Sequence, residues 1–239
     1  MLSKSQIKLI TRLKQKKYRI ADGFFVAEGL KVIQELLEST LELEYLFTTV
    51  PFKNSIKNET LITEHELKKI SFLTTPNKAL AVFKIPEENA INNNGLIVAL
   101  DSVRDPGNLG TIIRMCDWFG IKELVCSKET VDCYNPKVVQ ATMGSLTRVN
   151  INYLDLNLFL AKVKTPILGA FMDGENVYKS KLPNAGVLIM GNEANGISQA
   201  IEKQITQRIA IPRFGDLQVT ESLNVATATA ILLSEFRRN

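Results

Sequence analysis

Three segments of the chain are rich in glycine, asparagine and charge, and the first joins a tight turn to an arginine. Residues 100–110 lead into a helix predicted over about residues 109–119. In this turn Asn108 could cap the helix, and Gly110 would let a backbone or ligand approach closely. Apolar neighbours predict a buried Arg114, whose guanidinium would need an anionic partner. That partner could be a substrate anion, or Asp101 in an ordinary structural ion pair.

The second segment, Gly191-Asn-Glu-Ala-Asn-Gly196, lies between a predicted strand and a predicted helix. Its glycine spacing resembles a phosphate-binding loop, but Ile197 stands where such a loop has its lysine, which argues against nucleoside triphosphates. No GxGxxG follows any predicted strand, which argues against a dinucleotide-binding fold. A plain turn would need neither Asn192 nor Glu193 between its glycines, so we interpret this loop as functional.

The third segment runs from Ile211 to Gly215 and resumes at Ser222, before a final helix predicted over about residues 222–237. Ser222 is a suitable N-cap, and the alanines that follow it allow close helix packing. Both of these features are structural. Asn224, in contrast, begins an otherwise apolar helix and requires a polar partner.

The overall composition excludes several kinds of protein and of chemistry. The chain has 239 residues, 45% of them hydrophobic, and no run of about 18 apolar residues that could span a membrane. A single histidine, His65, argues against histidine-pair catalysis and multi-histidine metal centres, and we expect no metal. Three cysteines without a CxxC pair indicate reduced thiols in a cytoplasmic protein.

The first 20 residues carry seven basic side chains and no acidic one, although the net charge of the chain is only +4. Such a cluster can neutralise the phosphates of a nucleic acid. Equally, it could be a tail without a partner or the solvated face of a helix, which the spacing of the apolar residues predicts over about residues 3–19. The candidates for RNA binding within it are Lys14, Lys16, Lys17 and Arg19.

A polar linker at residues 86–95 divides the chain into two predicted domains, 1–92 and 93–239. Before it we expect strands at 24–27, 44–49 and 79–85 and helices at 29–39 and 64–72. After it we expect strands at 96–100, 123–127, 147–151, 167–171, 186–190 and 208–211, and a helix at 136–145 capped by Asn135. This alternation predicts an α/β fold with a mostly parallel sheet and helices on both faces. In such a sheet, ligands bind outside the carboxyl ends of the strands, where the three segments above would lie.

Taken together, these segments resemble the SpoU (TrmH-type) branch of the SPOUT RNA methyltransferases. The matching motifs are DPGNLGTIIR at 105–114, GNEANG at 191–196, and IP at 211–212 with SLNV at 222–225. Residues 140–148 are also similar, and the match covers residues 96–237. Residues 17–29 resemble a smaller α/β RNA-binding domain that often precedes the catalytic one and is similar to kink-turn-binding ribosomal proteins.

The resemblance implies a C-terminal trefoil knot that holds S-adenosylmethionine, in a homodimer whose active site is completed across the interface. The cofactor would be held mainly by the backbone of the second and third segments, at Met190, Gly191, Gly196, Ile211, Pro212 and Leu223. The implied reaction is methylation of a ribose 2′-hydroxyl of structured RNA, with ribosomal RNA as our first choice of substrate. The alternatives are a transfer-RNA methyltransferase, whose relatives usually lack the N-terminal domain, and a catalytically silent RNA-binding or ribosome-assembly factor.

The resemblance also assigns catalytic roles. Arg114 matches the family arginine that contacts the hydroxyl and the adjacent phosphate. We expect it to clamp the phosphate and stabilise the developing alkoxide, because a guanidinium hardly deprotonates. Glu193 would orient Arg114 or the cofactor loop. Neutral hydrogen bonds around the methyl-transfer site would come from Asn108, Ser222 and Asn224.

One segment departs from the family pattern. The stretch from Arg213 to Glu221 is longer than in many members and includes Phe214 and Asp216. Because this loop should lie near the target RNA, we expect it to affect the choice of nucleotide more than cofactor binding.

Overall fold

The computed structural model describes residues 2–52, 56–215 and 222–238. Its contacts divide the chain into two compact units, Met1–Glu87 with Asp132–Thr147, and Glu88–Val131 with Arg148–Asn239. The segment Asp132–Thr147 thus packs with the N-terminal unit, although it lies inside the range 93–239 predicted for the second domain. No helix in the described ranges is long and apolar enough to cross a membrane.

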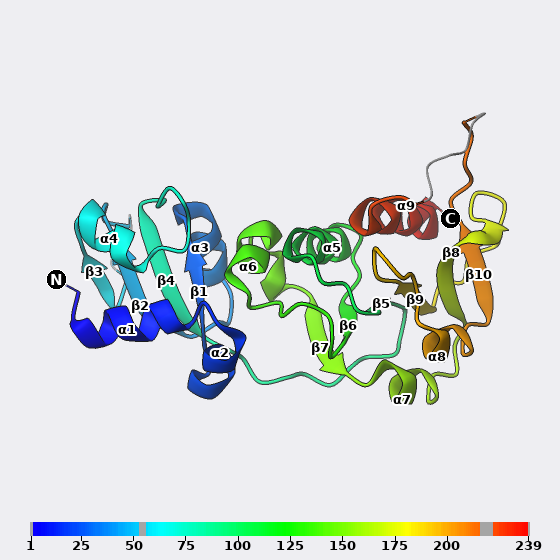
Figure 1. The fold of residues 1–239 in the computed structure, drawn as a ribbon, viewed down its shortest axis with the longest axis horizontal. Coiled ribbons are helices and arrows are strands. Elements are labelled where there is room, and N and C mark those ends of the chain that lie inside the picture. The colour runs from blue at the N-terminus through cyan, green and yellow to red at the C-terminus, as the bar shows by residue number, and fades with distance from the viewer. Residues whose placement is uncertain (1, 53–55, 216–221, 239) are drawn as a thin grey trace. The chain divides into compact units, whose positions relative to one another are not determined.

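The first unit is built on a four-stranded mixed sheet in the order β1-β4-β2-β3 (Figure 1). β4 runs antiparallel to β1 and β2, and β2 runs parallel to β3. Apolar residues of α1 and α4 pack on one face of the sheet, where Ile10 and Leu67 belong to the same buried cluster as Val26 and Val82. The elements are α1 (Lys4–Arg12), α2 (Lys16–Asp22), β1 (Phe24–Glu28), α3 (Leu30–Leu37), β2 (Leu43–Thr48), β3 (Glu59–Leu61), α4 (Glu64–Ile70), β4 (Ala79–Lys84), α6 (Pro136–Thr142) and a 3₁₀ turn η1 (Ser145–Thr147).

Arg19 breaks the single helix predicted over residues 3–19 into α1 and α2. Its Nη1 donates to the carbonyl oxygens of Leu13 and Lys14, at 2.8 and 3.0 Å, which satisfies the end of α1. Its Nε and Nη2 donate to Asp132 Oδ2 at 2.8 and 2.5 Å. The side chain is only 2% exposed and all three of its nitrogens donate hydrogen bonds within the fold, which argues against the prediction that Arg19 binds RNA. Arg19 holds the first unit together instead.

The second unit is a six-stranded, wholly parallel sheet in the order β10-β8-β9-β5-β6-β7. Helices α5 and α9 cover one face, and α7 and α8 cover the other (Figure 1). The elements are β5 (Leu96–Leu100), α5 (Pro106–Trp118), β6 (Glu123–Ser127), β7 (Asn150–Leu154), α7 (Leu156–Leu160), β8 (Ile167–Asn176), β9 (Gly186–Met190), α8 (Gln199–Glu202), β10 (Gln207–Ala210) and α9 (Val225–Arg238). The predicted α/β class with a mostly parallel sheet is confirmed, while the trefoil knot stays a prediction.

Two strands differ from their predicted bounds because of their partners in the sheet. The strand predicted at residues 147–151 begins only at Asn150, which pairs with Glu123 where β6 begins. The strand predicted at 167–171 continues to Asn176, because its second half pairs with Ile209 and Ala210 of β10. Strand ends depend on such partners, which local sequence does not specify.

Glu28, at the end of β1, is a buried carboxylate that fixes the segment after α4. It is 5% exposed, and its oxygens accept hydrogen bonds from Ser71 Oγ at 2.5 Å and from the Phe72 amide at 2.8 Å. Burial raises the pKa of Glu28 above its ordinary value of 4.5, against the opposing effect of these hydrogen bonds. Folding therefore shifts the protonation equilibrium of Glu28 toward the neutral carboxyl group.

This shift predicts a pH dependence of stability that Glu28→Gln removes. Because the pKa of Glu28 is higher in the folded state, its protonation adds to the free energy of unfolding. This contribution is complete below the pKa of the unfolded state and is lost as the pH rises through the pKa of the folded state. Glutamine is neutral at every pH, so the variant should gain free energy of unfolding relative to the wild type as the pH rises above 4.5 and through the folded-state pKa of Glu28. Urea denaturation at a series of pH values measures this. Glu87→Gln, at an exposed linker position, controls for the loss of one charge; a Glu28→Gln difference that is constant with pH would contradict the prediction.

Candidate active site

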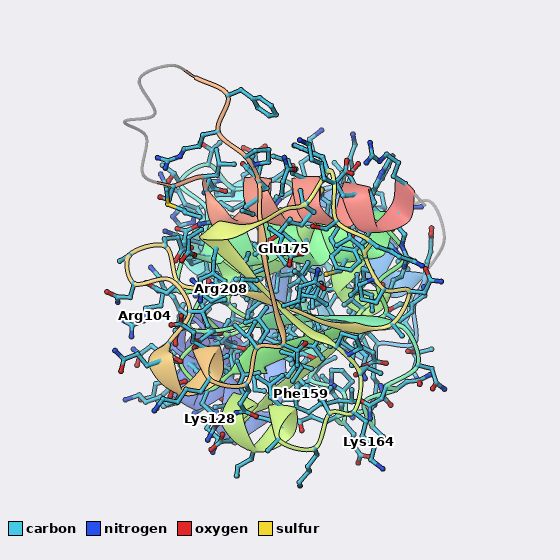
Figure 2. All side chains as sticks on the ribbon, turned by 90° about the vertical axis from the view of Figure 1, so that its right-hand side faces the viewer. Arg104, Lys128, Phe159, Lys164, Glu175 and Arg208 are labelled. Carbon is cyan, nitrogen blue, oxygen red and sulfur yellow. The ribbon has the colours of Figure 1, made fainter. Side chains whose placement is uncertain are left out.

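The three segments singled out in the sequence follow β5, β9 and β10 and lie at the carboxyl edge of the parallel sheet. In Figure 2, Arg104, which follows β5, lies on the left of the second unit, and Lys164, which precedes β8, lies at its lower right. β5 and β9 are neighbours in the sheet, so the first two segments begin side by side.

A row of side-chain hydrogen bonds joins all three segments. The Nδ2 of Asn108 donates to Glu193 Oε1 at 2.8 Å, and its Oδ1 accepts from Asn224 Nδ2 at 2.9 Å. These residues are 85 and 116 positions from Asn108 in the sequence. The structure thus brings together three of the five predicted catalytic residues.

Both predicted helix caps in these segments are replaced by a neighbouring residue. Asp105, not Asn108, caps α5, because its Oδ1 accepts from the Asn108 amide at 2.8 Å. Asn224, not Ser222, caps α9, since its Oδ1 accepts from the amides of Ala226 and Thr227 at 3.0 and 3.2 Å. Both helices therefore start away from the predicted residue, and the side-chain amide of Asn108 is left to bond Glu193 and Asn224.

The second segment folds back on itself and is fastened to the first. Asn192 pairs with Gly196 through two backbone hydrogen bonds of 2.9 Å. Its Nδ2 donates to the Ser102 carbonyl at 2.6 Å, and Asp101 Oδ2 accepts from the Ser198 amide at 2.7 Å. At Gly191 the backbone passes so close that a Cβ would lie 2.3 Å from the Gly196 carbonyl carbon. Glycine at position 191 is therefore required by the loop itself.

A cavity of about 1180 Å³ opens between the second and third segments. All six residues predicted to hold a cofactor line it, together with the predicted catalytic residues Glu193 and Ser222. The six are Met190, Gly191, Gly196, Ile211, Pro212 and Leu223. Met190 is buried, whereas Leu223 is half exposed at 49%. The lining thus combines apolar side chains with closely approaching backbone.

The sequence analysis missed an ion-pair cluster in the wall of this cavity. The Arg208 guanidinium contacts Asp173 Oδ1 and Glu202 Oε1, each at 2.5 Å, and stacks over the Phe171 ring at 3.5 Å. In Figure 2, Arg208 is labelled on the same side of the second unit as Arg104. The hydrogen bond from Arg208 lowers the pKa of Asp173. An arginine in a strand, with acids 6 and 35 residues away, gave no local signal in the sequence.

Arg114 lies on the exposed side of α5, so its predicted burial is wrong. The buried side of the helix is formed by Ile112, Ile113 and Cys116, which explains the apolar neighbours in sequence. Its guanidinium pairs neither with Asp101 nor with any other residue in the described ranges, and it does not line the cavity. Four residues later, Trp118 is 82% exposed on the same side of α5.

The remaining candidates lie in the first unit or outside the described residues. Lys14, Lys16 and Lys17 are exposed at the start of α2 and just before it, and the Lys17 ammonium lies 4.8 Å from the centre of the Tyr18 ring. Residues 216–221 of the predicted RNA-proximal stretch, Asp216 included, lie outside the described residues. No group of His, Cys, Asp and Glu within the described ranges could hold a metal ion.

The parallel sheet with its three joined loops is the architecture of a SPOUT-type methyltransferase domain. Residues 95–234 match the model of the SpoU rRNA Methylase family, and residues 4–81 match the MRM3-like substrate binding domain. The chain belongs to the SpoU rRNA methylase family. The family and enzyme class predicted from the sequence are confirmed.

Proteins with the same two-part organisation are similar over nearly the whole chain. A putative RNA methyltransferase of the TrmH family from Porphyromonas gingivalis is 39% identical, with a TM-score of 0.88 over 100% of this chain and 99% of that one. An AdoMet-bound rRNA methyltransferase from Sinorhizobium meliloti is 28% identical, with a TM-score of 0.85 over 100% and 97% of the two chains. The 23S rRNA (guanosine(2553)-2′-O)-methyltransferase RlmP of Bacillus subtilis is 28% identical over 95% of this chain and 93% of its own.

The close backbone approach at Gly191 predicts that Gly191→Ala distorts the second segment. The added methyl group would meet main-chain atoms of Gly196 and Ile197 at 2.3 and 2.4 Å, which cannot rotate away as a side chain can. We expect a loss of about 1–3 kcal/mol in the free energy of unfolding, measured by urea denaturation. Gly215→Ala is the matched control, because a Cβ there meets nothing within 4 Å. Equal stability of the two variants would contradict the close packing at Gly191.

Proposed function

We propose that this protein is an S-adenosylmethionine-dependent methyltransferase that acts on a ribose 2′-hydroxyl of ribosomal RNA. The observation that carries the proposal is the row of hydrogen bonds through Asn108, which joins the three family motifs beside one cavity. The names of the relatives support the substrate, since they are rRNA methyltransferases with both domains. The cytoplasmic location inferred from the sequence stays a prediction.

The cavity fits a cofactor and a nucleotide together. Its volume of about 1180 Å³ exceeds the usual range for one small ligand, roughly 300–1,000 Å³. When bound, S-adenosylmethionine supplies a methyl group that is already activated on a sulfonium sulfur. The lining backbone at Gly191 and Gly196 would hold it at close range, with Met190, Ile211 and Leu223 as apolar contacts. The carboxylate of Glu193 in the same wall complements its positive charge, whereas Glu202 is paired with Arg208.

The protein's contribution is alignment and charge stabilisation. Arg114 binds the phosphate next to the target ribose and stabilises the alkoxide that develops on the 2′-oxygen. Glu193 is held by Asn108 and keeps the second segment in place. Asn224, which also bonds Asn108, and Ser222 offer neutral hydrogen-bonding groups at the rim. None of these steps requires a histidine.

The exposed side of α5 supports a homodimer in which Arg114 acts on the partner's cavity. Trp118 presents a large apolar surface to solvent, which is typical of an interface. Arg114 lies on the same side of α5 and does not line the cavity of its own chain. A second copy docked on this side would bring its own cavity to Arg114.

The first unit docks structured RNA through the basic cluster that remains after Arg19 is excluded. Lys14, Lys16 and Lys17 are exposed. Exposed lysine side chains bind the phosphates of RNA without recognising its base sequence. The match of residues 4–81 to a substrate binding domain supports this role.

Arg114→Ala should abolish methyl transfer while leaving cofactor affinity nearly intact. The reason is that Arg114 contacts the RNA and not the cavity lining. Transfer of labelled methyl groups to ribosomal RNA measures the activity, and calorimetry with S-adenosylmethionine measures the cofactor affinity. Cofactor binding by the wild type without transfer to any RNA would instead favour a silent RNA-binding factor. Equal losses of transfer and cofactor affinity in Arg114→Ala would show that Arg114 is structural.

Co-expression of two inactive variants tests the shared site. Ile211→Trp fills the cavity of its own chain, and Arg114→Ala removes the arginine. If Arg114 acts across the interface, each mixed dimer has one complete site, which restores roughly a quarter of wild-type transfer for random pairing. If Arg114 acts within its own chain, every site carries a defect and no activity returns.

The docking role predicts that Lys14→Gln with Lys17→Gln weakens RNA binding and flattens its salt dependence. Each lost phosphate contact reduces the slope of log affinity against log salt by about 0.7–0.9. Substitution is preferable to deleting the first 92 residues, because Asp132–Thr147 packs with the first unit and would lose its support. Filter binding of ribosomal RNA at several salt concentrations measures the slope.

Lys162→Gln with Lys164→Gln is the matched control, because both lysines are exposed and Lys164 lies opposite Arg104 (Figure 2). The same slope change in both pairs would mean that the effect is general charge and not docking. Arg19→Gln should behave differently and lower the free energy of unfolding by about 3 kcal/mol, because it leaves Asp132 without its buried partner.

A further inference from the structure

An aromatic side chain stands exposed at the mouth of the cavity. Phe214 lines the cavity, yet it is 80% exposed. Its ring stacks nearly parallel to the ring of Tyr178, with centroids 6.5 Å apart and an interplanar angle of 25°. Tyr178 follows β8 and Phe214 follows β10, so two neighbouring strands place these rings together. Exposure of so large an apolar surface indicates that something covers it.

The apolar rim extends beyond Phe214 and contrasts with the interior. Met172 and Leu223 also line the cavity and are 54% and 49% exposed. Met190 and Ile197 of the same cavity are 2% and 7% exposed. The cavity therefore has a buried apolar part and a separate apolar rim that faces solvent.

We propose that Phe214, backed by Tyr178, is the platform on which a base of the RNA substrate stacks during methyl transfer. This inference rests on the function proposed above. The base is attached to the same sugar whose hydroxyl must reach the cavity, so the base lies within a few ångströms of the rim. Single-stranded bases are bound by stacking on aromatic rings, because every base offers a flat π face. Tyr178 holds the Phe214 ring in one orientation, which lowers the entropy cost of stacking.

Two other occupants fit the rim less well. Ligand pockets bury most of a small ligand, roughly 70–90% of its surface, whereas Phe214 projects into solvent and is a poor wall for a cofactor. A second copy docked through α5 would also lie beside this cavity, but a flat exposed ring backed by a second ring suits a base better than a protein side chain, and molar mass separates the two. The observations therefore favour RNA.

The test compares Phe214→Ala, Phe214→Leu and Phe214→Trp in the full-length protein. For Phe214→Ala we expect the KM for ribosomal RNA to rise about tenfold, as for the loss of one stacked base. Phe214→Leu should lose nearly as much because leucine is apolar but not flat, and Phe214→Trp should keep wild-type affinity. S-adenosylmethionine affinity and molar mass should stay unchanged in all three. Leu158→Ala, which removes a 62% exposed side chain on α7, is the control for loss of exposed apolar surface.

Each other outcome overturns the proposal in a recognisable way. Weaker S-adenosylmethionine binding in Phe214→Ala would make the ring a cover for the cofactor, and a halved molar mass would make it a dimer contact. Full activity of Phe214→Leu or of Phe214→Ala would mean that no stacking occurs. In each of these cases the wild type still methylates RNA. A wild type that transfers no methyl group to any RNA would instead refute the proposed function itself.

Discussion

The candidate site depends on one amide group that donates and accepts at the same time. Asn108 gives a hydrogen bond to Glu193 and receives one from Asn224, so a single side chain joins three distant segments. A carboxylate at this position could accept but not donate, and a hydroxyl could not reach in two opposite directions. The amide therefore fixes both sides of the row without placing a net charge beside the cavity. Because Asp105 caps α5, the Asn108 side chain is available for this role.

In this site, backbone groups form much of the cavity wall, whereas exposed side chains are proposed to contact the RNA. The cavity is lined by loops whose backbones approach closely, as at Gly191, and those loops are fixed by hydrogen bonds such as that of Asn192 to Ser102. Such walls change shape little, which suits a cofactor that is the same in every reaction cycle. The groups proposed to meet RNA, Arg114 and Phe214, are exposed instead. A large, irregular substrate can reach them only because they are outside the packed core.

Much of the fold could be predicted from the sequence because its signals are local, whereas the cavity-lining residues were predicted from the resemblance of short motifs to the SpoU family. Apolar runs such as residues 96–100 gave the parallel strands, and Asn135 caps α6 as expected. The caps of α5 and α9 could not be predicted, since Asp105 and Asn224 compete with near neighbours of equal capping ability. The Arg208 cluster was missed for a different reason: its two acids come from separate elements that only the folded chain brings together.

Arg19 and Arg114 show why residue type and neighbours do not decide the role of an arginine. Both predictions rested on sequence neighbours, and both were reversed in the structure with respect to burial. Arg19 lies in a basic cluster, yet Asp132, 113 residues away, and two carbonyl groups bind all sides of its guanidinium. Arg114 lies among apolar residues, but a helix turns about 100° per residue and places it roughly opposite the buried Ile112 and Cys116. A guanidinium whose hydrogen bonds are satisfied within the fold stabilises that fold. One that has no partner in the described part of its chain is available to an anion that arrives from outside, which is what phosphate recognition requires.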